Sequence, residues 1–412
     1  MSPTPDVELR ERVRRIPGIE RLLPALEGLP PAYLVGGAVR DLLRGADAVD
    51  VDIAVEGDAR SVARALAERL SAEVREHERF GTATVRAGDL GFDLATTRTE
   101  VYDEPGALPR VAAASLDEDL ARRDFAINAM AVGLTGDDLG HLYDPCGGLS
   151  DLNDGVVRVL HDRSFLDDPT RLLRAVRYEV RLGFRMNSAT ESLARAAVVD
   201  GALRTVSGAR VRDELLDLLG ESQAPAGVRR MHDLGLDLAL HPALDSDPDL
   251  VASASLGAAA IGADPALAAL AALCAAAPAE LDLWLADLHL PAAQRDSVAR
   301  AARVGPRLAR ELRAGEHQPS QLRSLLGREP VLSLALAMAM GAPSEPILRW
   351  VTELRSVRLE ISGDDLLAAG VPEGPAVGRA LDETLSRKLD GLVSGRDEEL
   401  ETALAVAREA AR

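Results

Sequence analysis

The spacing of apolar residues changes near residue 155, and this change constrains the fold more than any other feature of the sequence. Before it, short apolar or alternating runs separated by turns predict strands, because a period of two residues marks a half-buried strand. After Phe165, apolar residues recur every three to four positions over long stretches broken by prolines, which indicates helices. We therefore expect an α/β head, a mixed sheet with helices, followed by an all-α region.

The predicted elements are short in the head and longer beyond it. Strands are expected at Ala32–Val35, Val49–Val55, Thr82–Arg86, Gly91–Thr96 and, from a less regular pattern, Leu139–Tyr143. One helix is expected at Ser61–Leu70, and helical spacing is expected from Asp119 onward. The clearest later helices are Pro169–Leu182, Ser188–Val199 and Ala209–Leu219, with further helices after Val228. No fixed-period repeat accompanies them, so a repeat architecture is not expected.

Composition narrows the class of protein. Aromatic residues are 3% of the 412 residues, which argues against an all-β sandwich, and 47% hydrophobic residues exclude wholesale disorder. Cys146 and Cys274 are too few for a disulfide framework or a zinc site, and we expect reduced thiols. The first 29 residues lack the apolar core of a signal peptide, and Asp264 and Pro265 interrupt the most apolar stretch, Val251–Ala277. We therefore expect a cytoplasmic protein without a membrane span.

The charge balance argues at first against a nucleic-acid partner. The chain has 47 Lys+Arg and 66 Asp+Glu, a formal net charge of −19. The basic residues are nevertheless concentrated, since residues 158–185 hold 7 basic and 4 acidic residues, a net charge of +3. Residues 295–328 hold 8 basic and 3 acidic residues, a net charge of +5. The net charge of the whole chain therefore does not exclude a polyanion at these two stretches.

Asp50 and Asp52 are separated by one residue on a predicted strand. Residues i and i+2 of a strand point to the same face, so the two carboxylates repel each other unless a cation lies between them. Carboxylate oxygens are the ligands that Mg²⁺ prefers. The pair is either a magnesium site or a solvated strand face, and taken alone it does not decide between them.

Two further motifs suit the binding of phosphate. Gly36 and Gly37 follow a predicted strand and precede a predicted helix, where backbone N–H groups can bind an anion. Arg40 adds a fixed positive charge one turn later. Arg122 and Arg123 form a basic pair that suits a triphosphate. A tight turn and an ordinary exposed helix start are the alternatives for these motifs.

The helix that follows Asp168 carries a strip of arginines. Asp168 precedes a proline and therefore suits the helix N-cap. Arg171, Arg174 and Arg177 recur every three residues and lie along one side of the helix. Asp168 and Arg171 lie on adjacent turns, where together they could hydrogen-bond the edge of a base. A solvated amphipathic helix is the alternative.

The order of these motifs resembles that of a known family. The chain is similar to class II tRNA nucleotidyltransferases and bacterial poly(A) polymerases at Tyr33–Asp41, Asp50–Asp52, Arg122–Ala129, Asp144–Gly148 and Asp168–Tyr178. A later motif of that family resembles Ser207–Leu215, which carries Arg210 and Glu214, and the segment after it resembles Met231–Leu240. The resemblance covers residues 30–240, and beyond it only the helical character agrees.

The resemblance implies a polymerase-β-like nucleotidyltransferase head followed by an all-α neck, body and tail. We expect an N-terminal extension at 1–29, the head at 30–155, a base-recognising neck at 156–225, and a tRNA-binding body and tail at 226–412. Such enzymes add CCA to the 3′ end of tRNA without a nucleic-acid template. The expected partners are therefore the tRNA 3′ end, CTP and ATP, and the expected cofactor is Mg²⁺. The oligomeric state stays open.

The same resemblance assigns roles to single residues. Asp50 and Asp52 would hold the catalytic Mg²⁺ ions, and Asp93 lies where a third acidic residue is expected. Asp168 and Arg171 would read the Watson–Crick edge of CTP or ATP. The residues expected to bind the rest of the nucleotide, chiefly its triphosphate, are Gly36, Gly37, Arg40, Arg123, Arg174 and Arg177. Independently of the resemblance, the basic stretch at residues 295–328 predicts a track for the tRNA backbone at Arg295, Arg300, Arg303, Arg307 and Arg310.

The segment between Arg98 and Asp119 bears on which nucleotides are added. In the family it is a flexible loop that helps the switch from CTP to ATP, and CC-adding members shorten it. Here it keeps its length, which favours addition of A, but Glu104–Pro109 replaces the common arginine-rich centre, as in members that add only A. We expect full CCA addition. The alternatives are an A-adding or CC-adding enzyme, a poly(A) polymerase, or a non-catalytic relative that binds nucleotide or RNA.

Overall fold

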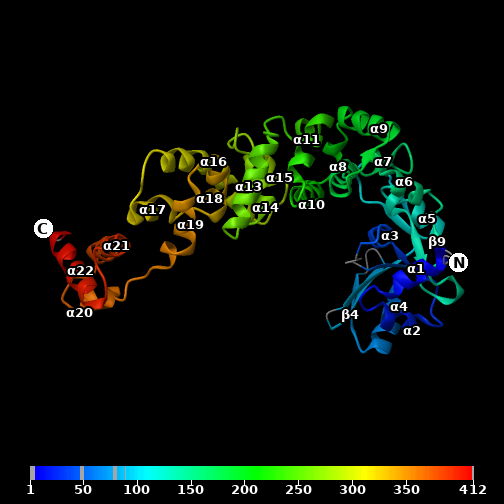
Figure 1. Cartoon of the computed structure of the whole chain (residues 1–412), viewed down its shortest axis with the longest axis horizontal. Coiled ribbons are helices and arrows are strands. Elements are labelled where there is room, and N and C mark those ends of the chain that lie inside the picture. The colour runs from blue at the N-terminus through cyan, green and yellow to red at the C-terminus, as the bar shows by residue number, and fades with distance from the viewer. Residues whose placement is uncertain (1–4, 47–50, 78–80, 89, 411–412) are drawn as a thin grey trace. The chain divides into compact units, whose positions relative to one another are not determined.

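The computed structural model describes residues 5–46, 51–77, 81–88 and 90–410. The chain divides into two compact units. The first comprises the residues up to Glu214 together with Asp233–Ala239, and the second comprises Leu215–His232 and the residues from Leu240 onward. All strands of the described residues lie in the first unit, and the second is helical (Figure 1). The predicted α/β head and helical remainder are therefore confirmed, while the finer division at 29, 155 and 225 stays a prediction.

A seven-stranded mixed sheet forms the centre of the first unit, with the order β3-β4-β5-β2-β1-β8-β9 among the described residues. Its central pair, β2 and β5, is parallel, and the other neighbours are antiparallel. The strands are β1 (Ala32–Val35), β2 (Asp52–Val55), β3 (Glu73–His77), β4 (Thr82–Ala87), β5 (Leu90–Thr96), β8 (Ala131–Gly133) and β9 (Leu142–Tyr143).

Most predicted strands of the head are confirmed, whereas one stretch predicted as helical is wrong. The strand predicted at Val49–Val55 is present from Asp52, and residues 49 and 50 lie outside the described part of the chain. The helix predicted from Asp119 onward is not continuous, because α5 (Leu116–Ala121) ends at Ala121 and the chain returns to the sheet as β8 after the short η2. The residues around β8 are all buried beside β1. A buried strand gives an unbroken apolar run, which periodicity cannot distinguish from a buried helix.

Helices pack on both faces of the sheet. The face that carries Ile53 is covered by α4 (Ala59–Leu70), which in turn packs against α2 (Ile19–Leu26), as Figure 1 shows. The opposite face carries Ala54, in an apolar cluster with two leucines of α5. Because side chains alternate along a strand, Asp52 points to the same face as Ala54.

A hairpin and a set of short helices complete the first unit. The hairpin, β6 (Arg98–Val101) paired with β7 (Arg110–Ala113), occupies the segment that the family resemblance describes as a flexible loop. The remaining elements are α1 (Pro5–Arg14), α3 (Gly37–Leu43), η2 (Ala126–Asn128), η3 (Gly136–Asp138), α6 (Gly148–Asp154), β10 (Val156–Val157), α7 (Ser164–Asp167), α8 (Arg171–Leu182), β11 (Arg185–Met186), α9 (Ser188–Val199), η4 (Ala202–Thr205), α12 (Leu236–Leu240) and the first part of α10 (Gly208–Leu219). The three helices predicted for this region, α8, α9 and α10, are confirmed within two residues at each end.

The second unit is built from helices packed on helices. The longest, α16 (Ala292–Arg313), packs against α14 (Pro265–Leu273), α15 (Asp282–Asp287) and α18 (Val331–Ala339). The last helices, α20 to α22, enclose an apolar cluster of their own, beside which Lys388 Nζ donates to the fully buried carboxylate of Glu399 at 2.5 Å. The helices are α11 (Ala224–Leu234), α13 (Pro248–Ala260), α14 (Pro265–Leu273), α15 (Asp282–Asp287), α17 (Pro319–Leu326), α18 (Val331–Ala339), α19 (Ser344–Thr352), η5 (Leu354–Ser356), α20 (Gly363–Ala368), α21 (Pro375–Leu389) and α22 (Arg396–Ala410). No helix of the described residues is both long enough and apolar enough to cross a bilayer.

Candidate active site

Two carboxylates lie side by side on the two central strands of the sheet. Asp52 begins β2 and lies directly opposite Asp93 in the parallel register between β2 and β5. Both side chains are exposed on the same face. Thr84, the neighbour of Asp93 on β4, donates its hydroxyl to Asp93 Oδ1 at 2.6 Å and so orients that carboxylate. Asp50, the other predicted metal ligand, lies outside the described residues.

A glycine turn lies close to these carboxylates. Gly36 has φ +71° and ψ −135°, a combination open to glycine alone, and it turns the chain from β1 into α3. A Cβ atom at Gly36 would lie 3.0 Å from Arg123 Nη1, and one at Gly37 would lie 3.5 Å from Arg40 Nη2. Both glycines and both arginines line one pocket of about 480 Å³, which Asp52 also lines. The predicted phosphate-binding residues are thus gathered beside a predicted metal ligand.

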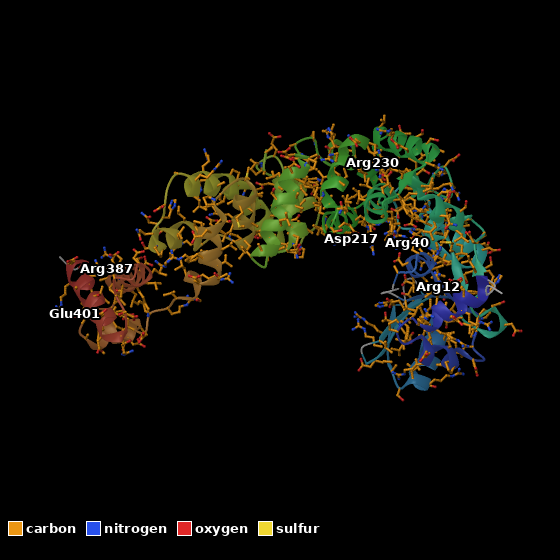
Figure 2. The ribbon with its side chains drawn as sticks, viewed as in Figure 1. Arg12, Arg40, Asp217, Arg230, Arg387 and Glu401 are labelled. Carbon is orange, nitrogen blue, oxygen red and sulfur yellow. The ribbon has the colours of Figure 1, made fainter. Side chains whose placement is uncertain are left out.

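Arg40 is held rigidly in this pocket. Its side chain is 3% exposed and donates to both oxygens of Asp41 at 2.9 Å and to Asn128 Oδ1 at 2.8 Å. It also lies over the ring of Tyr178, 5.3 Å from the centroid. Figure 2 marks Arg40 on α3, among the side chains of the first unit. A guanidinium fixed in this way presents its charge without losing side-chain entropy when an anion binds.

Asp119 joins the arginine pair to the root of the hairpin. Its carboxylate, at the end of α5, is buried and accepts hydrogen bonds from Arg122 at 2.6 and 3.0 Å, from Arg123 at 2.9 Å and from the backbone N–H of Arg98 at 3.1 Å. Burial alone would raise the pKa of Asp119, but the charges of Arg123 and Arg122 outweigh burial and hold it below its usual range. Arg122 also donates to Glu100 on β6 at 2.7 Å. The sequence-based analysis missed this role, although the spacing of three and four residues from Asp119 to the arginines was available to it.

Arg171 and Arg177 of α8 are buried and Arg174 is half-buried, so the alternative of a solvated helix is wrong for these three arginines. Arg171 is 5% exposed and donates to Ser164 Oγ at 2.6 Å and to a backbone carbonyl at 2.9 Å. Arg174 bridges two carboxylates, Asp124 at 2.7 Å and Glu214 at 2.8 Å, and Arg177 lies 3.6 Å from Glu214. Burial lowers the pKa of Arg174, but these two carboxylates raise it above the ordinary value, so the guanidinium stays charged.

The predicted cap at Asp168 is confirmed in its hydrogen bonding, although α8 itself begins at Arg171 with Thr170 as its N-cap residue. Asp168 Oδ1 accepts from the backbone N–H and the hydroxyl of Thr170, at 3.2 and 2.7 Å, and the Asp168 carbonyl accepts from the N–H of Arg171 at 3.1 Å, as in a helix cap. Asp168 Oδ2 accepts from Arg210 at 2.7 Å. The proline between Asp168 and the helix makes a short turn, in which the aspartate bonds two residues ahead. Both oxygens of the predicted base-reading carboxylate are therefore oriented.

Asp168 and Arg171 line a second pocket of about 410 Å³. Two hairpin residues, Glu100 and Tyr102, form part of its wall, and sequence reasoning did not find them. Burial and the neighbouring charge of Glu100 raise the pKa of Tyr102 well above its ordinary value, so this phenol stays protonated. Arg123 lines this pocket, the glycine pocket and the hollow beside Asp52 and Asp93. The described candidate residues of the first unit, apart from Arg177, thus line three pockets that share Arg123.

The arginines predicted as a tRNA track lie on α16 in the second unit. Several are paired with carboxylates there: Arg295 with Asp296, Arg303 with Asp282, and both Arg300 and Arg307 with Glu329. Arg310 is exposed. The track stays a prediction, and its positive charge is partly balanced within the unit.

Comparisons with known proteins agree with this geometry. The family described as the poly A polymerase head domain matches residues 32–158, and the family described as the probable RNA and SrmB-binding site of polymerase A matches residues 183–247. The CC-adding tRNA nucleotidyltransferase of Deinococcus radiodurans is 35% identical over 89% of this chain and 87% of its own length. The chain belongs to the tRNA nucleotidyltransferase and poly(A) polymerase family.

Other members are similar in different ways. The A-adding tRNA nucleotidyltransferase of Geobacter sulfurreducens is 36% identical over 92% of this chain, and that of Halalkalibacterium halodurans is 44% identical over 49% of it. The chain spans 45% and 48% of the lengths of these two relatives. A solved CCA-adding enzyme superposes with a TM-score of 0.83 at 32% identity, covering 98% of this chain and 99% of that one. The Thermotoga maritima CCA-adding enzyme complexed with tRNA superposes with a TM-score of 0.77 at 30% identity, covering 98% of each chain.

We predict that Asp119→Asn destabilises the protein by about 3 kcal/mol at neutral pH, because it leaves two half-buried arginines without their buried counter-charge. The lowered pKa of Asp119 means that its stabilisation is present above the ordinary aspartate pKa and is lost as pH falls through the lower, folded-state value. The difference in melting temperature between Asp119→Asn and the unsubstituted protein should therefore be smaller at about pH 3 than at about pH 7.

The matched control is Asp117→Asn, two residues earlier in the same helix and exposed to solvent. This variant should change stability by no more than about 0.5 kcal/mol. Equal melting temperatures for the two variants at neutral pH would contradict the role of Asp119.

Proposed function

We propose that this protein transfers nucleotides from ATP or CTP to the 3′ end of tRNA, with release of pyrophosphate. The observation that carries the proposal is the in-register pair of Asp52 and Asp93 beside the Gly36–Gly37 turn. The pocket lined by Asp168 and Arg171 shares the lining residue Arg123 with the pocket at Gly36 and Gly37. Family membership supports the same reaction, and neighbouring solved structures are named as complexes of CCA-adding enzymes with tRNA, CTP and ATP.

The residues divide between the triphosphate and the base. In the proposed reaction the 3′-hydroxyl of tRNA attacks the α-phosphate in line. Arg40 and Arg123 bind the departing phosphates from the side of the pocket formed by Gly36 and Gly37. The absence of Cβ atoms at these glycines leaves room for the two guanidinium groups. Asp168 offers a hydrogen-bond acceptor and Arg171 offers donors to the edge of a base. The bases of CTP and ATP carry an amino donor and a ring-nitrogen acceptor that complement these groups. Arg174 lines both pockets, and Arg177 pairs with Glu214, which lines the pocket of Asp168.

The exposed carboxylates fit Mg²⁺. Asp52 and Asp93 supply hard oxygen donors from adjacent strands on one face, and the predicted third donor is Asp50. Among the described residues alone, no group of three potential ligands gathers for a metal ion. When bound, Mg²⁺ would lower the pKa of the attacking hydroxyl and neutralise charge on the leaving group. The protein's own part is to hold these carboxylates in register.

We predict that Asp52→Ala lowers the rate of nucleotide incorporation by about 10³-fold, because it removes transition-state stabilisation worth several kcal/mol. The variant should fold normally, since the Asp52 side chain is exposed. It should also lose any rise in melting temperature that Mg²⁺ gives the unsubstituted protein. Asp137→Ala, another exposed carboxylate of the first unit, serves as the control. Incorporation by Asp52→Ala near the unsubstituted rate would exclude this metal site.

The identity of the added nucleotide is a narrower question. Addition of A alone is favoured over full CCA addition by the acidic, proline-rich segment Glu104–Pro109 in the hairpin. Sequence identity over nearly the whole chain does not separate the activities, since an A-adding relative is 36% identical and a CC-adding relative 35%. We therefore propose terminal A addition, and full CCA addition is the alternative that the sequence predicts.

A primer series tests this choice. tRNA lacking CCA, tRNA ending in C and tRNA ending in CC are each incubated with CTP alone, ATP alone and both. We expect one A to be added to the CC-ended tRNA and no reaction of CTP with the shortest tRNA. Addition of two C residues followed by one A to the shortest tRNA would establish the full CCA reaction instead. Long A tails on unrelated RNA would indicate a poly(A) polymerase.

We also propose that the α16 arginines form part of the tRNA-binding surface. Charge reversal of Arg295, Arg303 and Arg310 to Glu should weaken tRNA binding and reduce the slope of log affinity against log salt by about 2–3, one for each lost phosphate contact. The matched control reverses Arg349, Arg387 and Arg408, which are exposed elsewhere in the second unit. Equal affinities and slopes for the two triple variants would exclude the track.

A further inference from the structure

Three neighbouring strands of the sheet carry a row of polar side chains on the face of the candidate metal site. In the register of the sheet, Asp93 on β5 lies between Asp52 on β2 and Thr84 on β4. The hydroxyl of Thr84 donates to Asp93 Oδ1 at 2.6 Å. Thr84 therefore contacts the Asp93 carboxylate from the side of β5 that is opposite to Asp52.

The donor to Asp93 is uncharged, which distinguishes this carboxylate from those of the neighbouring pockets. Asp119, Asp124 and Asp168 each pair with an arginine, at 2.7 to 2.9 Å. Within the described part of the chain, Asp93 forms no ion pair and its Oδ2 accepts no hydrogen bond. A hydroxyl fixes the rotation of a carboxylate without neutralising its charge, so the negative charge of Asp93 stays available to a cation.

Thr84 is itself held firmly by the sheet. β4 pairs with β3 on one side and with β5 on the other. Its residues Ala83 and Val85 are buried, on the face that α4 covers. A β-branched side chain has few χ1 rotamers, so little rotation is open to the Thr84 hydroxyl. The position of Asp93 Oδ1 is therefore determined by the sheet.

We propose that Thr84 is a positioning residue that favours Mg²⁺ over Ca²⁺ at this site, by restricting Asp93 to one ligand oxygen. The proposal rests on the proposed function, which assigns a metal ion to Asp52 and Asp93. With Oδ1 held on the β4 side, Oδ2 is the oxygen that remains for an ion shared with Asp52.

The two ions differ in the carboxylate geometry that they accept. Mg²⁺ requires nearly regular octahedral geometry at short distances, which single oxygens of different groups satisfy. Ca²⁺ is larger, takes more ligands and accepts both oxygens of one carboxylate. Without the Thr84 hydroxyl, Asp93 can rotate and offer both of its oxygens, which suits the larger ion.

The test compares two threonines of the same strand. Thr84→Val removes the hydroxyl but keeps the branched shape and the strand propensity of the side chain. Thr82→Val is the matched control, because Thr82 lies on the same face of β4, is also half-buried, and pairs in register with Ala95 rather than with Asp93. Thr84→Ser restores the hydrogen-bond donor.

Metal binding is measured from the rise in melting temperature with increasing Mg²⁺ or Ca²⁺, without nucleotide or tRNA, and each variant is compared with its own metal-free melting temperature. We expect Thr84→Val to weaken Mg²⁺ binding about 10-fold, as the loss of a hydrogen bond to a metal-binding carboxylate does, and to leave Ca²⁺ binding nearly unchanged. The ratio of Mg²⁺ affinity to Ca²⁺ affinity should therefore fall about 10-fold in Thr84→Val and stay the same in Thr82→Val. Thr84→Ser should recover most of the Mg²⁺ affinity.

Three outcomes would overturn the proposal. Equal losses of Mg²⁺ and Ca²⁺ affinity in Thr84→Val would show that Thr84 supports the carboxylate without selecting the ion. The same ratio in Thr84→Val and Thr82→Val would show that the hydrogen bond to Asp93 has no role, and so would the lack of any metal-dependent rise in the unsubstituted protein. If the ratio shifts as expected but the unsubstituted protein adds no nucleotide to any tRNA, the proposed function fails while the role of Thr84 in ion selectivity stands.

Discussion

The buried carboxylate of Asp119 is the interaction on which the first unit depends. A single side chain accepts hydrogen bonds from Arg122, from Arg123 and from the backbone at the start of β6. Arg123 extends from it to the glycine turn, and Arg122 extends from it to the hairpin. A buried charge of this kind is tolerated only when several donors surround it. Two of these donors, Arg122 and Arg123, also line the candidate site. The hydrogen bonds that stabilise the Asp119 carboxylate therefore also position these two arginines in the site.

Much of the fold follows from local sequence patterns, and the failures have physical causes. The alternation in β4 and β5 and the 3.6-residue spacing of α8, α9 and α10 are visible because one side of each element is buried and the other is not. β8 escaped detection because both of its faces are buried. The hairpin escaped because its strands are short and half-exposed, so their pattern resembles that of a loop.

The candidate site was predictable in its residue types but not in their connections. Family resemblance pointed to Asp93, Gly37 and Arg123, which the structure gathers at one edge of the sheet. The partners of the arginines could not be predicted, because Asp124 and Glu214 lie far from Arg174 in sequence. Local rules find the bond from Asp168 to Thr170, but not the second partner of Asp168, Arg210, which is 42 residues away. The spacing of residues in the sequence predicts contacts within one helix or strand. It does not predict contacts between residues that are distant in sequence and meet only in the folded chain.

The pairing of almost every pocket arginine with a carboxylate has a consequence for turnover. A cluster of unpaired guanidinium groups would hold any phosphate tightly, including the products of the reaction. Here Arg122, Arg123 and Arg174 each have an acidic partner within 3 Å. In the proposed reaction, an incoming triphosphate would compete with these carboxylates for the arginines. The same carboxylates would pair with the arginines again as pyrophosphate leaves, which would favour release of that product.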